Sequence, residues 1–296
     1  MKKLMLFCLF LFSVTTYAEE SKPNTAKKFV LTAAVNSSSG AYAEAWNDLL
    51  EVCQNDIQAN SNTGGAVGNL NVLDNDRTVV FALAHMDLYE YYGIKDPNYI
   101  TDHLIVQKLG NEQVHIIVSK VPKFTNYMYK DITFNSITDL KGFPVGGSGG
   151  GVFTARVLNK YGNYGFSGDV KEFSSGDELL DAVVSGKIAA AIMVGKNLPI
   201  LKDPKWKDKL SIITTGTSIP EDLKKYYSLG GVNYPGFTRS MTPTFETPAI
   251  IISRNWDGEK KKQAVEDLKT CINNNKGTLS DLGGFWKDIK PKKQLE

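Results

Sequence analysis

The sequence lacks a surplus of either charge, with 34 Lys and Arg residues against 32 Asp and Glu residues. Residues 1–18, which we interpret below as a signal peptide, contain two lysines and no acid. Subtracting 2 from 34 leaves 32 basic residues against 32 acidic ones in the mature chain. Nucleic acids and anionic membranes bind to a concentrated positive field, which this balance does not supply. We therefore expect no nucleic-acid partner.

After the N-terminus, the sequence also lacks any apolar run long enough to cross a membrane, which takes about 20 residues. The N-terminus itself has the three parts of a secretory signal: a positive end at residues 2–3, an apolar run over 4–14 and small residues over 16–18. The apolar run is too short to span a bilayer comfortably. We predict that residues 1–18 are a cleaved signal peptide and that the mature protein is periplasmic. An uncleaved anchor is the alternative.

Cysteine and histidine are scarce, with three residues of each. Only Cys53 and Cys271 remain in the mature chain, and an oxidising compartment favours a disulfide between them. Two buried free thiols are the alternative. The histidines, at positions 85, 103 and 115, show no metal-ligand spacing with these cysteines, so we expect neither a metal site nor a cofactor.

Short apolar strands alternate with polar loops and helices in the first third of the chain. Strands are predicted over residues 29–35, 56–61 and 78–84, and helices over 41–53 and 66–73. Strand, loop and helix in repeated order indicate a mainly parallel sheet in an α/β domain. Two further strands are predicted over 104–109 and 113–119, separated at Gly110 and Asn111.

The same pattern restarts beyond Val121, which predicts a second α/β unit. We expect two lobes, each with a mixed, mainly parallel sheet flanked by helices, joined by a chain that crosses between them twice. Residues 29–122 and 249–296 would form the first lobe, and residues 123–248 the second. Residues 226–247, rich in Gly, Pro and aromatic residues, fit no element clearly.

Three loops share one design, in which a strand ends, small polar or glycine residues follow and a helix begins. They comprise residues 36–42, 62–66 and 146–153. The amides of a helix start have no partner inside the helix, and together with the helix dipole they favour an anion such as a carboxylate. Ligands of open α/β sheets bind at this edge, beyond the carboxyl ends of the strands. We interpret the loops as the walls of a ligand cleft; the alternative is three well-capped turns.

One of these loops, residues 146–150, also matches the G-x-S-x-G nucleophile elbow of serine hydrolases. That fold requires a histidine after the nucleophile, and all three histidines precede Ser148. We therefore interpret Ser148 as a hydroxyl donor to a bound ligand and keep a serine hydrolase as an alternative.

Side chains suited to a carboxylate or to cleft walls lie near these loops. Of the four arginines, Arg156 and Arg239 are candidates for a two-pronged carboxylate contact. Tyr42 and Phe153 stand at glycine-bearing helix starts and are candidates for aromatic walls, as is Phe245.

The glycine loops resemble those of the TAXI family, the solute receptors of one branch of TRAP transporters. The resembling stretches are residues 39–42, 63–73, 137–142 and 145–156, in order along nearly the whole mature chain. The resemblance implies a periplasmic-binding-protein fold of the second type, no catalysis, and delivery of a glutamate-like or other small carboxylate to a membrane permease.

The resemblance also implies a set of ligand contacts. Where the family carries an acidic residue and a Gln near the third strand, this chain has Ala84-His85-Met86-Asp87. His85 is therefore a candidate for a pH response of the pocket, with a capping role as the alternative. The contacts expected from the two lobes are Ser38, Ser39, Gly40, Tyr42, Thr63, Gly64, Ser148, Gly149 and Val152.

Taken together, these features favour a monomeric, exported receptor that closes around a small organic anion for a TRAP-type importer. Two alternatives stay open: a receptor of an ABC importer with a more apolar ligand, and a hydrolase that uses Ser148.

Overall fold

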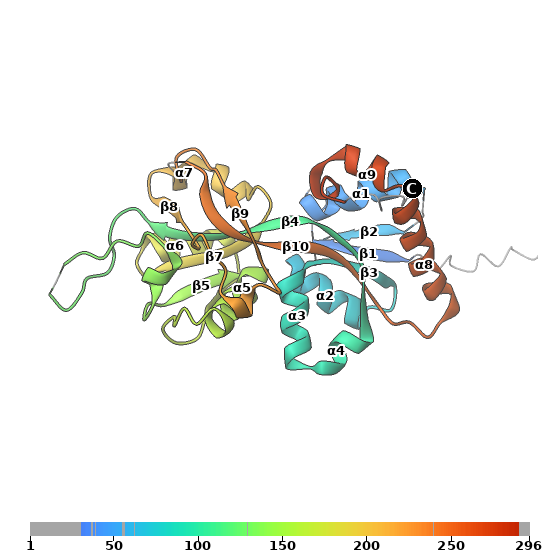
Figure 1. The fold of residues 1–296 in the computed structure, drawn as a ribbon, viewed down its shortest axis with the longest axis horizontal. Coiled ribbons are helices and arrows are strands. Elements are labelled where there is room, and N and C mark those ends of the chain that lie inside the picture. The colour runs from blue at the N-terminus through green and yellow to red at the C-terminus, as the bar shows by residue number, and fades with distance from the viewer. Residues whose placement is uncertain are drawn as a thin grey trace, which may run out of the picture.

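The protein consists of two lobes joined by long strands, as the computed structural model shows (Figure 1). It describes residues 31–36, 38, 40–54, 57–61, 63–128, 130–238 and 240–289. The expected signal peptide, Ser39 and Arg239 lie outside these residues. No helix in the described ranges is long and apolar enough to cross a membrane.

The first lobe is built on three parallel strands. Strand β1 (Thr32–Asn36) lies between β2 (Gln58–Ser61) and β3 (Val79–His85). Every residue of β3 is buried, as expected of a strand covered on both faces. The helices of this lobe are α1 (Ala41–Cys53), α2 (Gly65–Asn75), α3 (Met86–Lys95), α4 (Pro97–Asp102), α8 (Glu259–Asn274) and α9 (Lys276–Leu282), followed by the 3-10 turn η4 (Gly284–Trp286).

The second lobe has a similar centre. Strand β5 (Val145–Ser148) pairs in parallel with β6 (Lys171–Phe173) and β7 (Ala190–Gly195). The remaining elements are β8 (Leu210–Ile213), β9 (Ser228–Val232), α5 (Gly150–Tyr161), α6 (Gly176–Val184), α7 (Pro204–Lys207) and the 3-10 turns η1 (Ile137–Leu140), η2 (Pro199–Lys202) and η3 (Glu221–Leu223). The region 226–247, unassigned from sequence, thus contributes β9 and the start of another strand.

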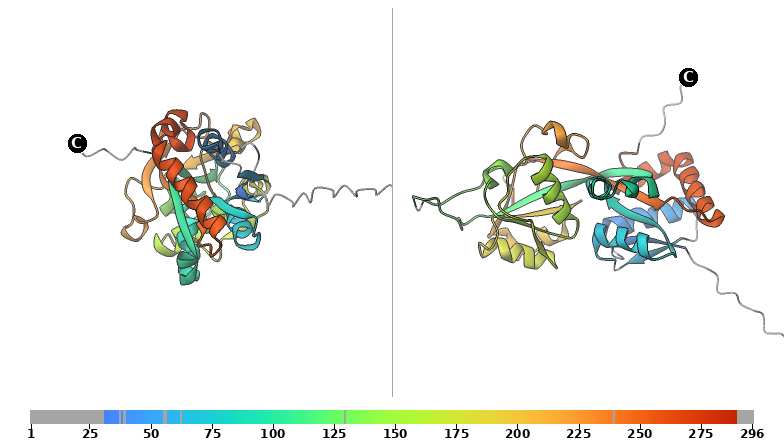
Figure 2. Two further views of the ribbon diagram at one scale, coloured as in Figure 1. Left: turned by 90° about the vertical axis from the view of Figure 1, so that its right-hand side faces the viewer. Right: turned by 90° about the horizontal axis from the view of Figure 1, so that it is seen from below.

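Strands β4 (His103–Ser119) and β10 (Thr242–Arg254) run antiparallel through both lobes and join the two sheets into one mixed sheet (Figures 1 and 2). The two strands predicted over 104–109 and 113–119 are therefore one strand, and the predicted break is wrong. Residues 110–111 stay extended because Asn111 pairs with Pro248 and because Gly110 allows the backbone of Phe285 to approach. Because β4 and β10 each belong to both lobes, the lobe boundaries predicted at residues 122 and 248 are not tested and stay a prediction.

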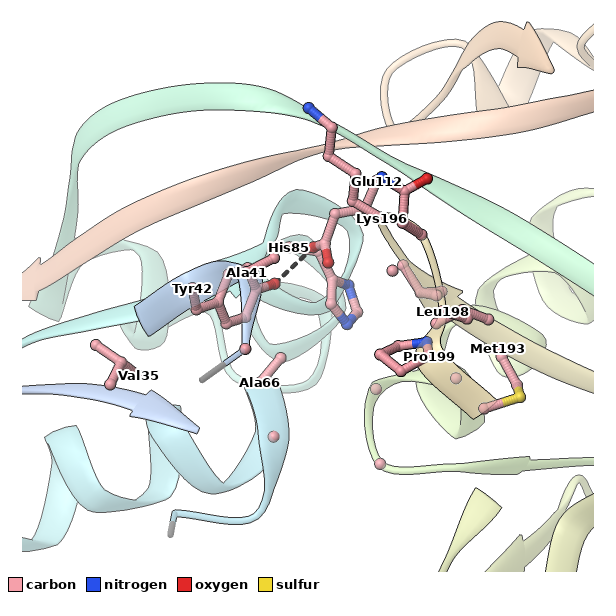
Figure 3. Close-up of a pocket in the computed structure, with 18 of the residues that line it drawn as sticks. Val35, Ala41, Tyr42, Ala66, His85, Glu112, Met193, Lys196, Leu198 and Pro199 are labelled. Carbon is pink, nitrogen blue, oxygen red and sulfur yellow. Dashed lines mark hydrogen bonds between the residues drawn. The ribbon is translucent and has the colours of Figure 1, made fainter. Parts of the chain in front are cut away.

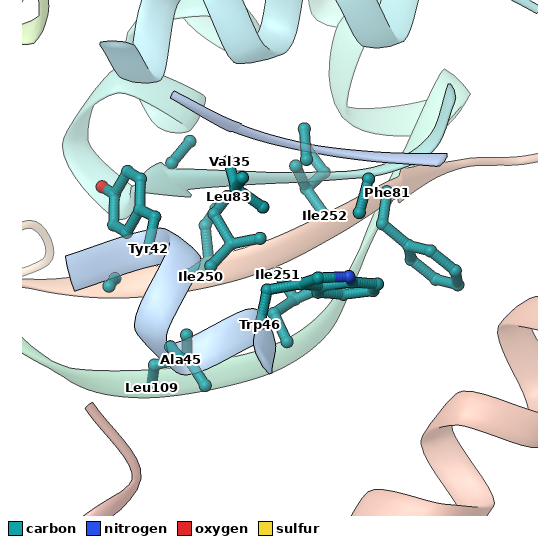
Figure 4. Packing of buried hydrophobic residues seen from close by; sticks show 14 of the residues in the cluster. Val35, Tyr42, Ala45, Trp46, Phe81, Leu83, Leu109, Ile250, Ile251 and Ile252 are labelled. Atoms are coloured by element: carbon teal, nitrogen blue, oxygen red, sulfur yellow. The ribbon is translucent and has the colours of Figure 1, made fainter. Parts of the chain in front are cut away.

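Each lobe has its own apolar core. In the first lobe, α1 packs Trp46 and Leu49 onto the sheet, where Trp46 lies beside Phe81 and the isoleucines of β10 (Figure 4). The indole of Trp46 donates to the Ile57 carbonyl at 3.1 Å, so its polar atom is satisfied in the core. Two further buried clusters lie in the second lobe.

The predicted disulfide is confirmed. Cys53, at the end of α1, is bonded to Cys271 of α8, with the two Cα atoms 5.9 Å apart. The bond fastens the C-terminal helices to the start of the first lobe.

Replacing both cysteines by alanine should lower the free energy of unfolding by about 2–4 kcal/mol, because the unfolded chain then regains the freedom of a very long loop. Urea denaturation measures the change. Neither cysteine lines the ligand cleft described below, so ligand affinity should not change. An unaltered denaturation midpoint would contradict this role of the bond.

Candidate functional site

A cleft of about 1040 Å³ lies between the two lobes and is lined by both of them. From the first lobe, Tyr42 and His85 project toward Met193, Leu198 and Pro199 of the second (Figure 3). A volume of this size is at the upper end of the range for small-molecule sites. The site is therefore large enough for an organic solute with its water.

Four helices begin at this cleft, two from each lobe. The residues at the starts of α1, α2, α5 and α6 all line it. Three of these starts have glycine at the capping position and no side-chain cap: Gly40, Gly64 and Gly149. At the fourth, the Ser175 hydroxyl accepts from the Glu178 amide at 3.2 Å. Three sets of unpaired amides and the positive ends of their helix dipoles thus meet in one space, which suits an anion.

Steric constraints explain why glycine is found at two positions around the start of α5. Gly149 has φ +51°, in the left-handed region that favours glycine. A Cβ on Gly151 would lie 2.2 Å from the Ile192 carbonyl oxygen, so only glycine lets α5 start this close to β7. The local sequence therefore places the start of α5 against the sheet edge.

A buried polar cluster, formed by His85, Asp87, Thr154 and Tyr227, joins the lobes beside the cleft. Asp87 accepts from Thr154 Oγ1 at 2.7 Å and from the Tyr227 hydroxyl at 2.6 Å, both in the second lobe. It also bonds to His85 Nδ1. Burial alone would raise the pKa of Asp87, but the charge of His85 and these hydrogen bonds together lower it. Asp87 is therefore a buried carboxylate held by both lobes.

A second carboxylate, Glu112, lies at the centre of β4 and accepts from the Tyr42 hydroxyl at 2.5 Å (Figure 3). Burial raises the pKa of Glu112, although the charge of His85 acts in the opposite sense. Burial and the nearby Glu112 raise the pKa of Tyr42 well above its ordinary value. Tyr42 is thus held against β4 and forms part of the cleft wall.

The charged side chains at the surface of the cleft are divided between the lobes. Glu44 and Asp48, one turn apart on α1, line it from the first lobe, and Lys196 and Lys202 line it from the second. Burial and then the like charge of Glu44 raise the pKa of Asp48. Neither acid forms an ion pair or a side-chain hydrogen bond with a described residue. Lys196 Nζ donates to the Gly284 carbonyl at 2.6 Å, across the cleft.

Six of the predicted ligand contacts line this cleft, three of them through glycine backbones: Gly40, Tyr42, Gly64, His85, Ser148 and Gly149. Ser38 is exposed and does not line it. Thr63 does not line it either, and it bonds to Asn69 of α2. Ser39 and Arg239 lie outside the described residues.

The other predicted contacts pack against neighbouring side chains and do not line the cleft. Val152 and Phe245 are fully buried in the second-lobe core, with Phe245 stacked on Tyr227. Phe153 packs against Tyr91 and Tyr92 of α3, between the lobes. Arg156 lies over the Phe153 ring, 5.3 Å from its centroid, and outside the cleft. The side chains of these four residues do not face the ligand space.

Sequence reasoning missed Glu112, Lys196 and Phe285, which line the cleft. Glu112 lies beside the predicted turn at 110–111, and Phe285 comes from the far end of the chain. Only the tertiary fold brings them to the site. Glu44 and Asp48, four residues apart, carried a detectable signal, because that spacing puts both on one helix face.

The hydrolase alternative requires a hydrogen bond between Ser148 and a histidine base. His85 and Ser148 line the same cleft, but no hydrogen bond links them, and His85 Nε2 faces Gly150. Within the described residues, no group of three or more His, Cys, Asp or Glu side chains could hold a metal ion.

Replacing Tyr227 by phenylalanine should lower the free energy of unfolding by about 1.5–3 kcal/mol, because Asp87 would lose one hydrogen bond to a buried charge. Thermal or urea unfolding measures the loss. Tyr226→Phe is the matched control, since this neighbouring hydroxyl takes no part in the Asp87 cluster. Equal effects of the two substitutions would show that Asp87 does not hold Tyr227.

Comparison with solved structures supports the two-lobed fold. No protein-family profile matches the sequence, and no curated protein matches it significantly. Among solved structures, the substrate-binding protein of an amino acid ABC transporter matches with a TM-score of 0.52 and 9% identity, over 88% of this chain and 96% of that one. The protein AbpA from Streptococcus pneumoniae, an amino acid ABC transporter substrate-binding protein bound to L-arginine, matches with a TM-score of 0.51 and 13% identity, over 88% and 94%.

The GluR0 ligand-binding core in complex with L-glutamate is also similar, with a TM-score of 0.51 and 10% identity, over 88% of this chain and 97% of that one. Identities this low show the fold alone. The expected membership of the TAXI family is not confirmed. The chain has the two-lobed α/β fold of periplasmic solute-binding proteins.

Proposed function

We propose that this protein is a solute-binding receptor that captures a small carboxylate, of the amino acid class, between its lobes and delivers it to an import permease. The observation that carries the proposal is the meeting of three glycine-capped helix starts, from both lobes, at one cleft. A carboxylate accepts hydrogen bonds from such amides and is stabilised by the dipoles.

The division of charge in the cleft supports a zwitterion. An ammonium group fits beside Glu44 and Asp48, whose mutual repulsion no described cation relieves, and a carboxylate fits the helix starts near the second-lobe lysines. Met193, Leu198 and Phe285 add apolar wall. A ligand that satisfies both lobes stabilises the closed arrangement, which is how such receptors respond to their solutes.

The similar solved structures support an ABC importer better than a TRAP importer as the permease, since two of them are described as amino acid ABC transporter proteins. The N-terminal pattern of charge and apolar residues supports export to the periplasm. The receptor of an ABC importer, which the sequence analysis left as an alternative, therefore replaces the TRAP receptor as the leading interpretation.

A thermal-shift screen of the mature chain against the L-amino acids tests the proposal. At about 100 times its dissociation constant, a true ligand should stabilise the fold by about 2.7 kcal/mol. The amine that lacks the carboxylate of that ligand should give no shift. The proposal is wrong if no amino acid raises the melting temperature, or if the matching amine raises it equally.

Asp48→Asn should weaken binding of the amino acid about fivefold to tenfold. An exposed ion pair contributes up to about 1 kcal/mol, and a partly buried one contributes more. Affinity for the same carboxylate without its amino group should stay unchanged. Glu51→Gln is the matched control on the same helix, since Glu51 does not line the cleft. Isothermal titration calorimetry gives both affinities; equal losses for both ligands would contradict the ammonium site.

A further inference from the structure

His85 presents an unused ring nitrogen to the second lobe. It is the last residue of β3, is 2% exposed, and bonds through Nδ1 to Asp87. Because Nδ1 is engaged in this way, the other nitrogen, Nε2, carries the free hydrogen-bonding capacity of the ring. Nε2 is buried and has no hydrogen-bond partner. A buried polar atom without a partner is costly, so its position calls for a physical reason.

Nε2 faces the first residue of α5. A Cβ on Gly150 would lie 2.1 Å from Nε2, so the imidazole of the first lobe abuts the helix start of the second. That helix start has no side-chain cap, and its first amides have no partner within the helix. If Nε2 accepted from one of these amides, a hydrogen bond would join them, and none is formed. When the ring is protonated, Nε2 is a donor, so donors of both lobes then lie side by side without an acceptor.

We propose that an oxyanion of the bound solute bridges His85 Nε2 and the first amides of α5, and so fastens β3 of the first lobe to α5 of the second. We call this contact the clasp. It rests on the proposed function and couples ligand capture to lobe closure. The bridging oxygen accepts from the imidazolium and from the helix start together, so it gains a charge-assisted hydrogen bond and the dipole interaction.

The charges around His85 favour its protonated form. Asp87 of α3 and Glu112 of β4 are the nearest acids. Tyr42 of α1 and Tyr227, before β9, contribute neutral hydroxyls, and Lys196 after β7 lies beyond Glu112. Burial would lower the pKa of His85, but the charge and hydrogen bond of Asp87, with Glu112, raise it overall. Because the clasp uses the protonated ring, affinity is full below this pKa and falls as the pH rises through it.

Calorimetric titration of the wild-type protein with L-glutamate and, separately, L-arginine tests the clasp at pH values from about 6 to about 9. Affinity should fall about tenfold across this range, the expected loss of one charge-assisted hydrogen bond. His85→Asn keeps a donor near Nδ1 but has none at Nε2, so it should bind about tenfold more weakly at the lowest pH. His85→Gln places a neutral donor near Nε2 and should recover part of that loss. The ligand affinity of neither variant should depend on pH.

His103→Gln is the matched control, because His103 is also buried and bonded to a carboxylate, that of Asp74, but lies outside the cleft. It should keep the wild-type affinity and pH slope. A ¹H NMR titration of the wild-type protein adds a test without substitution: ligand should raise the pKa of His85 by about one unit.

The outcomes separate the clasp from the proposed function. If the amino acids bind but His85→Asn keeps the wild-type affinity and pH slope, the clasp is wrong and the receptor stands. A ligand-independent pKa of His85 also overturns the clasp. If neither amino acid binds the wild-type protein at any pH, the receptor proposal for these ligands fails and the clasp fails with it.

Discussion

Unpaired backbone amides at the helix starts are the constraint on which the cleft depends. A helix leaves its first N–H groups without partners, and most proteins satisfy them with a capping side chain. Here Gly40, Gly64 and Gly149 occupy the capping positions, so the donors stay open toward one space. In the proposed function an anion from solution satisfies them, and since the helices belong to both lobes, such an anion would also hold the lobes together.

The long strands β4 and β10 make this arrangement possible. They carry the sheet from one lobe into the other, so the lobes are linked by backbone pairing. Beside them, Asp87 takes hydrogen bonds from Thr154 and Tyr227 across the junction. This buried carboxylate fixes the orientation of His85, whose other nitrogen is buried against the start of α5.

Local pattern predicted the strand–loop–helix units, the three glycine loops and the two-lobed α/β fold, because each follows from a few neighbouring residues. The disulfide between Cys53 and Cys271 followed from the compartment and the scarcity of cysteine. The continuous strand through Gly110 could not be predicted, since it depends on pairing with Pro248, far along the chain. For the same reason Glu112 and Phe285 escaped notice, whereas Phe245 was expected at the cleft and packs in the core.

The central claim is that a carboxylate rests on helix starts of both lobes. Chemical shifts of the ¹⁵N-labelled backbone test it most directly, because an amide proton that donates to a carboxylate moves downfield. The account predicts that an amino acid ligand shifts the amides of Gly65 in the first lobe and of Gly150 and Gly151 in the second together. Binding that leaves the amides of either lobe unshifted would contradict it.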